Sequence, residues 1–109
     1  MYASFIYLAL NKVYGLSFLL PTVVYGYDPD VCRKDAAGAW IKRSEYGDRS
    51  SKASYGWEAD RIVPLSSGSP DVLENLQPLQ WANNVTKGDD YPNWKPAVTS
   101  DGNRNIELR

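Results

Sequence analysis

The order of short elements between Trp57 and Gly88 constrains this chain more than any other feature of its sequence. WEADRIVPL predicts an extended segment that ends near Pro64, because proline cannot donate to a strand ladder. SSGSPDVLEN is turn material with one helical turn expected over 70–74, and LQPLQ predicts a second short strand. Helix formers then occupy 80–87, and glycine follows where a helix C-terminus favours it. The sequence therefore predicts strand, loop, strand and helix in that order.

The rest of the chain adds one strand and a weakly patterned tail. AAGAWIKRSEYG predicts a strand around 39–42, and the polar, glycine-punctuated run SEYGDRSSKASYG predicts a loop. From Trp94 onward the chain has low hydrophobicity and no clear period, so we expect a poorly ordered or edge-packed tail. A length of 109 residues suits one domain with one modest core. We divide it into an apolar N-terminal segment (1–26), the main unit (27–92) and a C-terminal tail (93–109).

The apolar N-terminal segment is interrupted by polar residues. Asn11 and Lys12 split it into runs that fall short of the roughly 20 residues needed to span a bilayer. A secretory signal requires positive charge before its apolar run, and no positively charged side chain precedes this one. We therefore expect an additional strand or helix packed on the domain of a cytoplasmic protein, with a signal peptide or membrane anchor left open. Cys32 is the only cysteine, so the chain can form neither an internal disulfide nor a two-thiolate zinc site.

Charge is distributed unevenly along the chain, although its formal total is only -1 and its pI about 5.3. Residues 31–52 carry six basic and three acidic side chains, whereas residues 53–92 carry two basic and six acidic ones. A basic arm followed by an acidic stretch suits a phosphate-binding surface beside a cation-binding one. The alternative is two solvated faces of opposite sign.

The run YGWEADRIVPLSSGSPDVLENLQPLQWANNVTKGD resembles the HNH endonuclease family. Its elements are an acidic residue before the expected histidine, a nearby proline, a glycine-containing loop, an Asn-Leu-Gln stretch, and a helix with an Asn and Lys pattern. The upstream run YDPDVCRKDAAGAWIKRSEYGDRS resembles the segment that precedes this motif in one subgroup. The resemblance implies an α+β fold, a small ββα-metal domain that cuts phosphodiester bonds. It assigns Asp60 and Asn84 as metal ligands, Asn75 as the asparagine that orients the base, and Arg61 to the general-base position.

The resemblance also implies a cofactor and a partner. Carboxylate and amide oxygens suit Mg²⁺ or Mn²⁺, with Zn²⁺ as an alternative. The partner is nucleic acid, with DNA favoured over RNA, while the oligomeric state is left open. Basic side chains are expected to contact phosphates, and the candidates are Arg33, Lys34, Lys42, Arg43, Arg49 and Lys87.

Arg61 departs from the family pattern, and the chain contains no histidine at all. A guanidinium with a pKa above about 12 has no lone pair to accept a proton from water at physiological pH. General-base catalysis typically contributes 10² to 10⁴-fold, so we expect a nucleic-acid-binding protein whose hydrolysis is weakened or lost. Replacement of the base by another group, and a sequence altered from an active parent, stay open. The alternative from another class is a non-catalytic structural or protein-interaction module on the same scaffold.

Each of these residues also has an ordinary structural interpretation. Asp60 and Arg61 together could form a surface ion pair of little energetic value. Asn75 could shape a turn, and we expect Asn83 to lie on a solvated helix face. Three of the tryptophans are expected to serve packing rather than base stacking: Trp57, Trp81 and Trp94.

Overall fold

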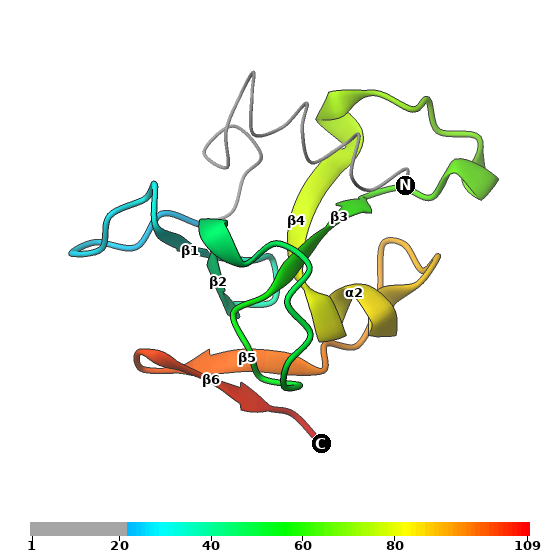
Figure 1. Ribbon diagram of the computed structural model, residues 1–109. Helices are drawn as coiled ribbons and strands as arrows, with labels where there is room; N and C mark the ends of the chain where they lie inside the picture. The colour runs from blue at the N-terminus through cyan, green and yellow to red at the C-terminus, as the bar shows by residue number, and fades with distance from the viewer. Residues whose placement is uncertain (1–21) are drawn as a thin grey trace.

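The computed structural model describes residues 22–109, which form three two-stranded antiparallel sheets and one short α-helix that lies beside the β3–β4 sheet (Figure 1). This arrangement agrees with the expected α+β class. The expected N-terminal strand or helix falls mainly on residues 1–21, which lie outside the described residues. Within 22–109, no helix has the length and apolar character needed to cross a membrane. Thr22 begins the described chain with a bridge to Lys34, through backbone hydrogen bonds of 2.7 and 3.0 Å.

The first hairpin joins β1 (Cys32–Lys34) to β2 (Trp40–Lys42), which confirms the predicted strand around 39–42. Asp35 organises its turn, because one carboxylate oxygen accepts hydrogen bonds from the backbone N–H groups of Ala37 and Ala39, each at 2.9 Å. Gly38 adopts a φ of 83°, which other residues rarely do. A single-turn 3₁₀ helix, η3 (Arg43–Glu45), follows directly and leads into the predicted loop.

The predicted strand, loop, strand and helix are all present in order. β3 (Trp57–Arg61) pairs with β4 (Leu76–Gln80), and α2 (Trp81–Lys87) follows at once and packs on β3. The Gln80 side chain caps α2 by accepting hydrogen bonds from two backbone N–H groups, and the Gly88 N–H closes its last turn on the Asn84 carbonyl. At Gly56, before β3, a Cβ atom would lie 1.7 Å from the Asp48 carbonyl oxygen, so only glycine fits.

The segment between β3 and β4 is an extended loop held at its base. Two 3₁₀ turns lie within it, η4 (Leu65–Ser67) and η5 (Leu73–Asn75), where the sequence predicts a single helical turn over 70–74. Asn75 closes the loop, because its side chain both accepts from the Val63 N–H at 2.9 Å and donates to the Val63 carbonyl at 2.8 Å.

The C-terminal segment corrects the expectation of a poorly ordered or edge-packed tail. It forms a hairpin of β5 (Val98–Asp101) and β6 (Arg104–Glu107) around Gly102, whose φ is 65°. Val98 has no exposed surface, so the hairpin is part of the core. An Asp-Gly-Asn turn joins the strands, and its tight geometry compensates for their low hydrophobicity.

The interior is as polar as it is apolar. Within residues 22–109, one small apolar cluster contains Ala39, Ala82, Ala97 and Val98 beside Trp81, and another contains Ile41 and Trp57 beside Tyr46. Between the hairpins lies a group of buried polar side chains that we call the polar hub: Asp35, Gln80, Asn83 and Asn105. In the described chain, no buried side-chain nitrogen or oxygen lacks a hydrogen-bond partner. A small core of this kind is held together by hydrogen bonds that connect separate hairpins.

Asn83 is the centre of the polar hub, which corrects the expectation that it lies on a solvated helix face. It is fully buried, and its amide donates to Asp35 at 3.1 Å and to the Val98 carbonyl at 2.9 Å. Its carbonyl accepts from the N–H groups of Ala97 and Val98, both at 2.8 Å. One side chain thus joins α2, the first hairpin and the C-terminal hairpin. Asn105 makes a similar bridge, since it pairs with both backbone groups of Trp40.

Candidate functional site

A cavity of about 310 Å³ opens between the end of β3, the start of the following loop and α2. We call it the cleft. Asp60, Arg61 and Asn84 all line it, so the structure brings together three of the residues that the sequence singles out. The other lining residues are Ala59, Pro64, Leu65, Ser66, Gly88 and Asp89. Asp60 and Asn84 reach the cleft from different elements, because β3 ends beside the outer face of α2.

Asp60 is bound on both of its carboxylate oxygens and is only 7% exposed. The Lys87 ammonium lies 3.1 Å from one oxygen and 3.3 Å from the other, and the Gln77 amide donates to the first at 3.0 Å. Burial raises the pKa of Asp60 above its ordinary value, while the Gln77 hydrogen bond and the Lys87 charge oppose that rise. Gln77 faces Asp60 across the strand pair, so the β3–β4 register fixes this contact.

Lys87 is a buried structural cation, with 1% of its surface exposed. Besides its pair with Asp60, its ammonium donates to the Arg61 carbonyl at 2.9 Å. The position corrects the expectation that Lys87 contacts phosphate, because the ammonium would have to leave both partners to reach a ligand. Lys87 instead fastens the C-terminal turn of α2 to the end of β3.

Arg61 stands at the edge of the cleft with 24% of its side chain exposed. Its guanidinium donates to both carboxylate oxygens of Asp71, at 3.1 and 3.4 Å. Asp71 belongs to the loop between β3 and β4, so this pair ties that loop to the cleft. The side chain presents a fixed positive charge and no proton acceptor.

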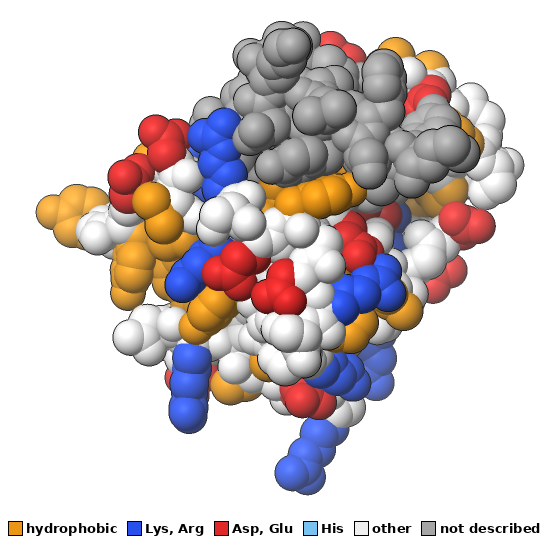
Figure 2. Space-filling model, in the orientation of Figure 1, with side chains coloured by type: hydrophobic (Ala, Val, Ile, Leu, Met, Phe, Trp, Pro, Cys, Tyr) orange, Lys and Arg blue, Asp and Glu red, His pale blue; other side chains and the backbone are white. Residues whose placement is uncertain are grey.

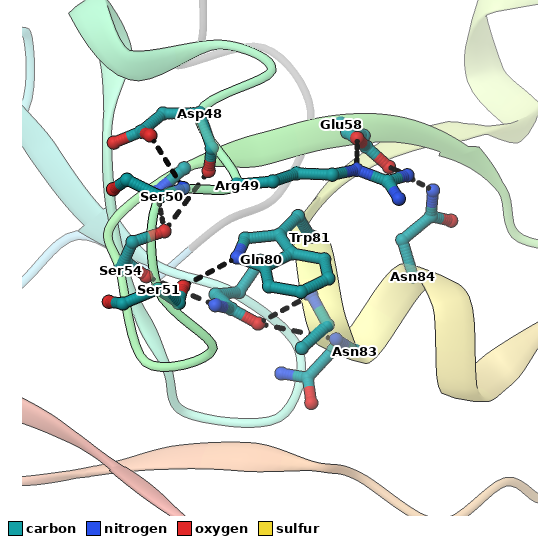
Figure 3. A network of polar contacts seen from close by, with 12 residues as sticks. Asp48, Arg49, Ser50, Ser51, Ser54, Glu58, Gln80, Trp81, Asn83 and Asn84 are labelled. Carbon is teal, nitrogen blue, oxygen red and sulfur yellow. Dashed lines mark hydrogen bonds and ion pairs between the residues drawn. The ribbon is translucent and has the colours of Figure 1, made fainter.

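Asn84 faces Glu58 across the outer surface of the β3–α2 pair (Figure 3). Its amide N–H donates to Glu58 at 3.0 Å, and Arg49 makes a two-bond pair with the same carboxylate at 2.7 and 2.8 Å. Burial alone would raise the pKa of Glu58, but the bonds from Arg49 and Asn84 outweigh it and hold that pKa below its ordinary value. The side-chain amide oxygen of Asn84 is therefore the atom left to bind an ion.

The side chain of Asn75 binds the backbone of the loop between β3 and β4. Both ends of its side-chain amide are bonded to the backbone of Val63, as described above, and its own carbonyl accepts from the Ile62 N–H at 2.8 Å. Those bonds set the path of the chain just after Arg61. The interpretation of Asn75 as a residue that shapes a turn describes these contacts.

The basic arm divides into buried and exposed side chains. Arg33 is 4% exposed and donates to the Pro29 carbonyl at 2.8 Å, which corrects its assignment as a phosphate contact for the same reason as Lys87. Lys34, Lys42 and Arg43 are half-buried, whereas Arg49 is exposed but occupied by Glu58. On the face in Figure 2, acidic and basic side chains are intermixed over the described part of the surface. On this face, phosphate binding would therefore rest on a few separate cations rather than on one broad patch.

The cleft offers oxygen ligands of the kind that Mg²⁺ and Mn²⁺ prefer, from Asp60 and Asn84. Within residues 22–109, no three Asp, Glu or Cys side chains gather closely enough to hold an ion by themselves. An ion at Asp60 would also share that carboxylate with the Lys87 ammonium, at a distance where like charges repel strongly. The donor types fit a hard divalent cation, and we expect its binding to be weak.

Comparisons with known proteins found no matching family model, no matching curated protein and no matching solved structure. Sequence reasoning missed three residues that shape the cleft, namely Glu58, Gln77 and Asp71. The first two carry a usable signal, since Glu58 shares a strand face with Asp60 and Gln77 lies opposite it in a two-strand register. Asp71 has no such signal, because its contact depends on the path of a long loop.

Proposed function

We propose that this chain binds nucleic acid through an HNH-like ββα site whose phosphodiester hydrolysis is weakened or lost. One observation carries the proposal: Asp60, Arg61 and Asn84 line a single cavity at the junction of β3 and α2. The chain order of the elements around the cleft, two strands and then a helix, supports the same proposal. A chance surface ion pair would not require an asparagine from a separate element to face the same space.

The residues divide the chemistry among them. The Asp60 carboxylate and the side-chain amide oxygen of Asn84 would hold Mg²⁺ or Mn²⁺. The ion would neutralise charge that develops on a phosphate and on the leaving oxygen. Arg61 can bind a phosphate oxygen as a fixed cation, but it cannot take a proton from an attacking water. Hydrolysis therefore lacks a general base at this position, which lowers the rate by roughly 10² to 10⁴-fold.

Contacts with the nucleic-acid backbone are assigned to those of the six candidate basic side chains that retain some exposure. These are Lys34, Lys42, Arg43 and Arg49. Arg43 lies 3.9 Å from the largely exposed Asp30, a weak pair that a phosphate can replace. Four such contacts predict a slope of log affinity against log salt of about -3 to -4 on duplex DNA. We propose DNA as the preferred partner over RNA.

The second candidate is a non-catalytic protein-interaction module on the same scaffold. The observation that favours it is the Lys87–Asp60 pair, because the buried carboxylate is already neutralised without an ion. A module of this kind would keep the cleft as a structural joint. It would bind duplex DNA without the steep salt dependence that phosphate contacts impose, or would not bind it.

A titration of supercoiled plasmid with Mg²⁺ or Mn²⁺ separates the two candidates when both binding and nicking are measured. We expect salt-dependent binding with or without the ion, and slow nicking that requires it. Asp60→Asn is the variant that removes the ion's charged ligand. Salt-independent binding or no binding at low ionic strength would contradict the proposal and favour the interaction module.

A further inference from the structure

A second cavity, of about 210 Å³, lies away from the cleft and shares none of its lining residues. We call it the aromatic pocket, and it is lined by Tyr27, Cys32, Trp40, Lys42, Tyr55 and Asn103. Its residues come from the segment before β1, which supplies Tyr27, and from the first hairpin, the loop before β3 and the tip of the C-terminal hairpin. Three aromatic rings line this small space, and none of them belongs to the two hydrophobic clusters described above.

The rings form a fixed floor and an open wall. Trp40 is the floor, because it is 5% exposed and its indole N–H donates to the Gly102 carbonyl at 2.8 Å. Tyr27 is the wall, because it is 44% exposed while its ring centre lies 4.7 Å from that of Trp40 at a tilt of 51°. A flat ligand could stack on the exposed side of Tyr27 without moving the floor.

Two ammonium groups lie against rings of the aromatic pocket, one from the lining residue Lys42 and one from its neighbour Lys34. Lys34 lies 4.9 Å from the ring centre of Trp40, and Lys42 lies 4.8 Å from that of Tyr55. Among residues 22–109, neither ammonium has a carboxylate within ion-pair distance. A cationic ligand is disfavoured, because these lysines already occupy the ring faces and would repel it. A flat ring that carries negative charge beside it fits both features.

We infer that the aromatic pocket holds one unpaired nucleobase of a nucleic-acid strand, stacked on Tyr27, while Lys34 and Lys42 contact the flanking phosphates. The volume supports a single base, since it lies below the roughly 300 Å³ at which pockets for whole drug-sized ligands begin. Aromatic side chains bind bases of any sequence because every base has a π-face. The inference rests on the proposed function, to which it adds a preference for unpaired or flipped nucleotides.

The test compares three labelled DNA probes by fluorescence anisotropy: a paired duplex, the same duplex with one bulged nucleotide, and that bulge without its base. We expect the intact protein to bind the bulged duplex more tightly than the other two. Tyr27→Ala should weaken binding to the bulged duplex by about 5- to 150-fold, the range for loss of one stacked base. Binding to the paired duplex should not change.

Tyr25→Ala is the matched control, because Tyr25 is fully exposed and lies two positions from Tyr27. It should bind all three probes like the parent. Tyr55→Leu provides a second variant within the pocket, and it should lose the preference for the bulged base as well. If the parent binds paired duplex with salt dependence but does not distinguish the bulge with a base from the bulge without one, the inference fails and the proposed function stands. If the parent binds none of the probes, both fail.

Discussion

The polar hub and the cleft use the same residue types for opposite purposes. In the hub, the side chains of Asp35 and Asn83 are enclosed and bonded to neighbouring hairpins. In the cleft, Asp60 and Asn84 face a cavity that a ligand can enter. The difference lies in which elements surround each pair. The C-terminal hairpin, below β3 and α2 in Figure 1, bonds to the hub, whereas β3, α2 and the loop after β3 border the open cleft.

Two consecutive asparagines separate these regions. Asn83 and Asn84 differ by about 100° around the axis of α2, so one faces the hub while the other faces Glu58 and the cleft. Asn83 is buried with its side chain bonded on both ends, whereas Asn84 lies beside an accessible cavity. The comparison predicts that adjacent substitutions will have very different effects.

The largest expected effect is the loss of stability in Asn83→Ala. The change would remove the Asn83 bonds of two backbone N–H groups and one carbonyl, and one of the two bonds to an Asp35 carboxylate oxygen, so we expect a loss of about 4 kcal/mol. Asn84→Ala should cost less than about 1 kcal/mol, because it removes one contact at a half-exposed site. Chemical denaturation of both variants measures the contrast. Similar losses would mean that the hub and the cleft do not differ as described.

The next effect concerns the buried cation of the cleft. Lys87→Met should lower the free energy of unfolding by about 3 kcal/mol, because it leaves the buried Asp60 carboxylate without its counter-charge. Added Mn²⁺ should raise the melting temperature of this variant more than that of the parent, since the competing ammonium is gone. Lys95→Met changes an exposed lysine and is the control. Equal stability losses in the two variants would contradict the structural role of Lys87.

A smaller effect is expected from the charge of the polar hub. Burial raises the pKa of Asp35 above its usual 3.8, although hydrogen bonds led by that from Gln80 oppose the rise. The folded protein then holds this proton more tightly than the unfolded chain. Its contribution to stability is complete below pH 3.8 and is lost as the pH rises through the folded pKa. Unfolding measured from pH 3 to 7 should show this decline in the parent and not in Asp35→Asn. If the free energy of unfolding of the parent rose relative to that of Asp35→Asn as the pH increased from 3 to 7, the assigned direction of the pKa shift would be contradicted.

Local signals account for the parts of the fold that the sequence predicts. The Pro64 stop and the glycine after α2 set the limits of β3 and of the helix, and each acts through its own backbone. The convergence of Asp60 and Asn84 on one cavity follows from that local order together with the family resemblance. Their detailed partners do not, because Gln77 and Lys87 reach Asp60 only after the strands pair.

The missed features depend on contacts between distant segments. Asn83 bonds to residues of the C-terminal hairpin, and no periodicity within a seven-residue helix can reveal those partners. The same hairpin lacks an apolar pattern because only Val98 among its strand residues is a buried hydrophobic side chain. Its Asp-Gly-Asn turn was a usable signal that hydrophobicity alone overlooks. Lys87 shows the same limit, since charge type does not predict burial when the partner comes from a distant segment.

The most direct test of the central claim is the rate of plasmid nicking by Arg61→His. If the cleft is an HNH-like site that lacks its base, histidine should raise Mg²⁺- or Mn²⁺-dependent nicking by about 10² to 10⁴-fold over the parent. Arg61→Gln is the matched control, because it removes the same charge and the pair with Asp71 but supplies no base. The gain should disappear when Asp60→Ala is added. A folded Arg61→His protein that nicks no faster than Arg61→Gln with either ion would contradict the account.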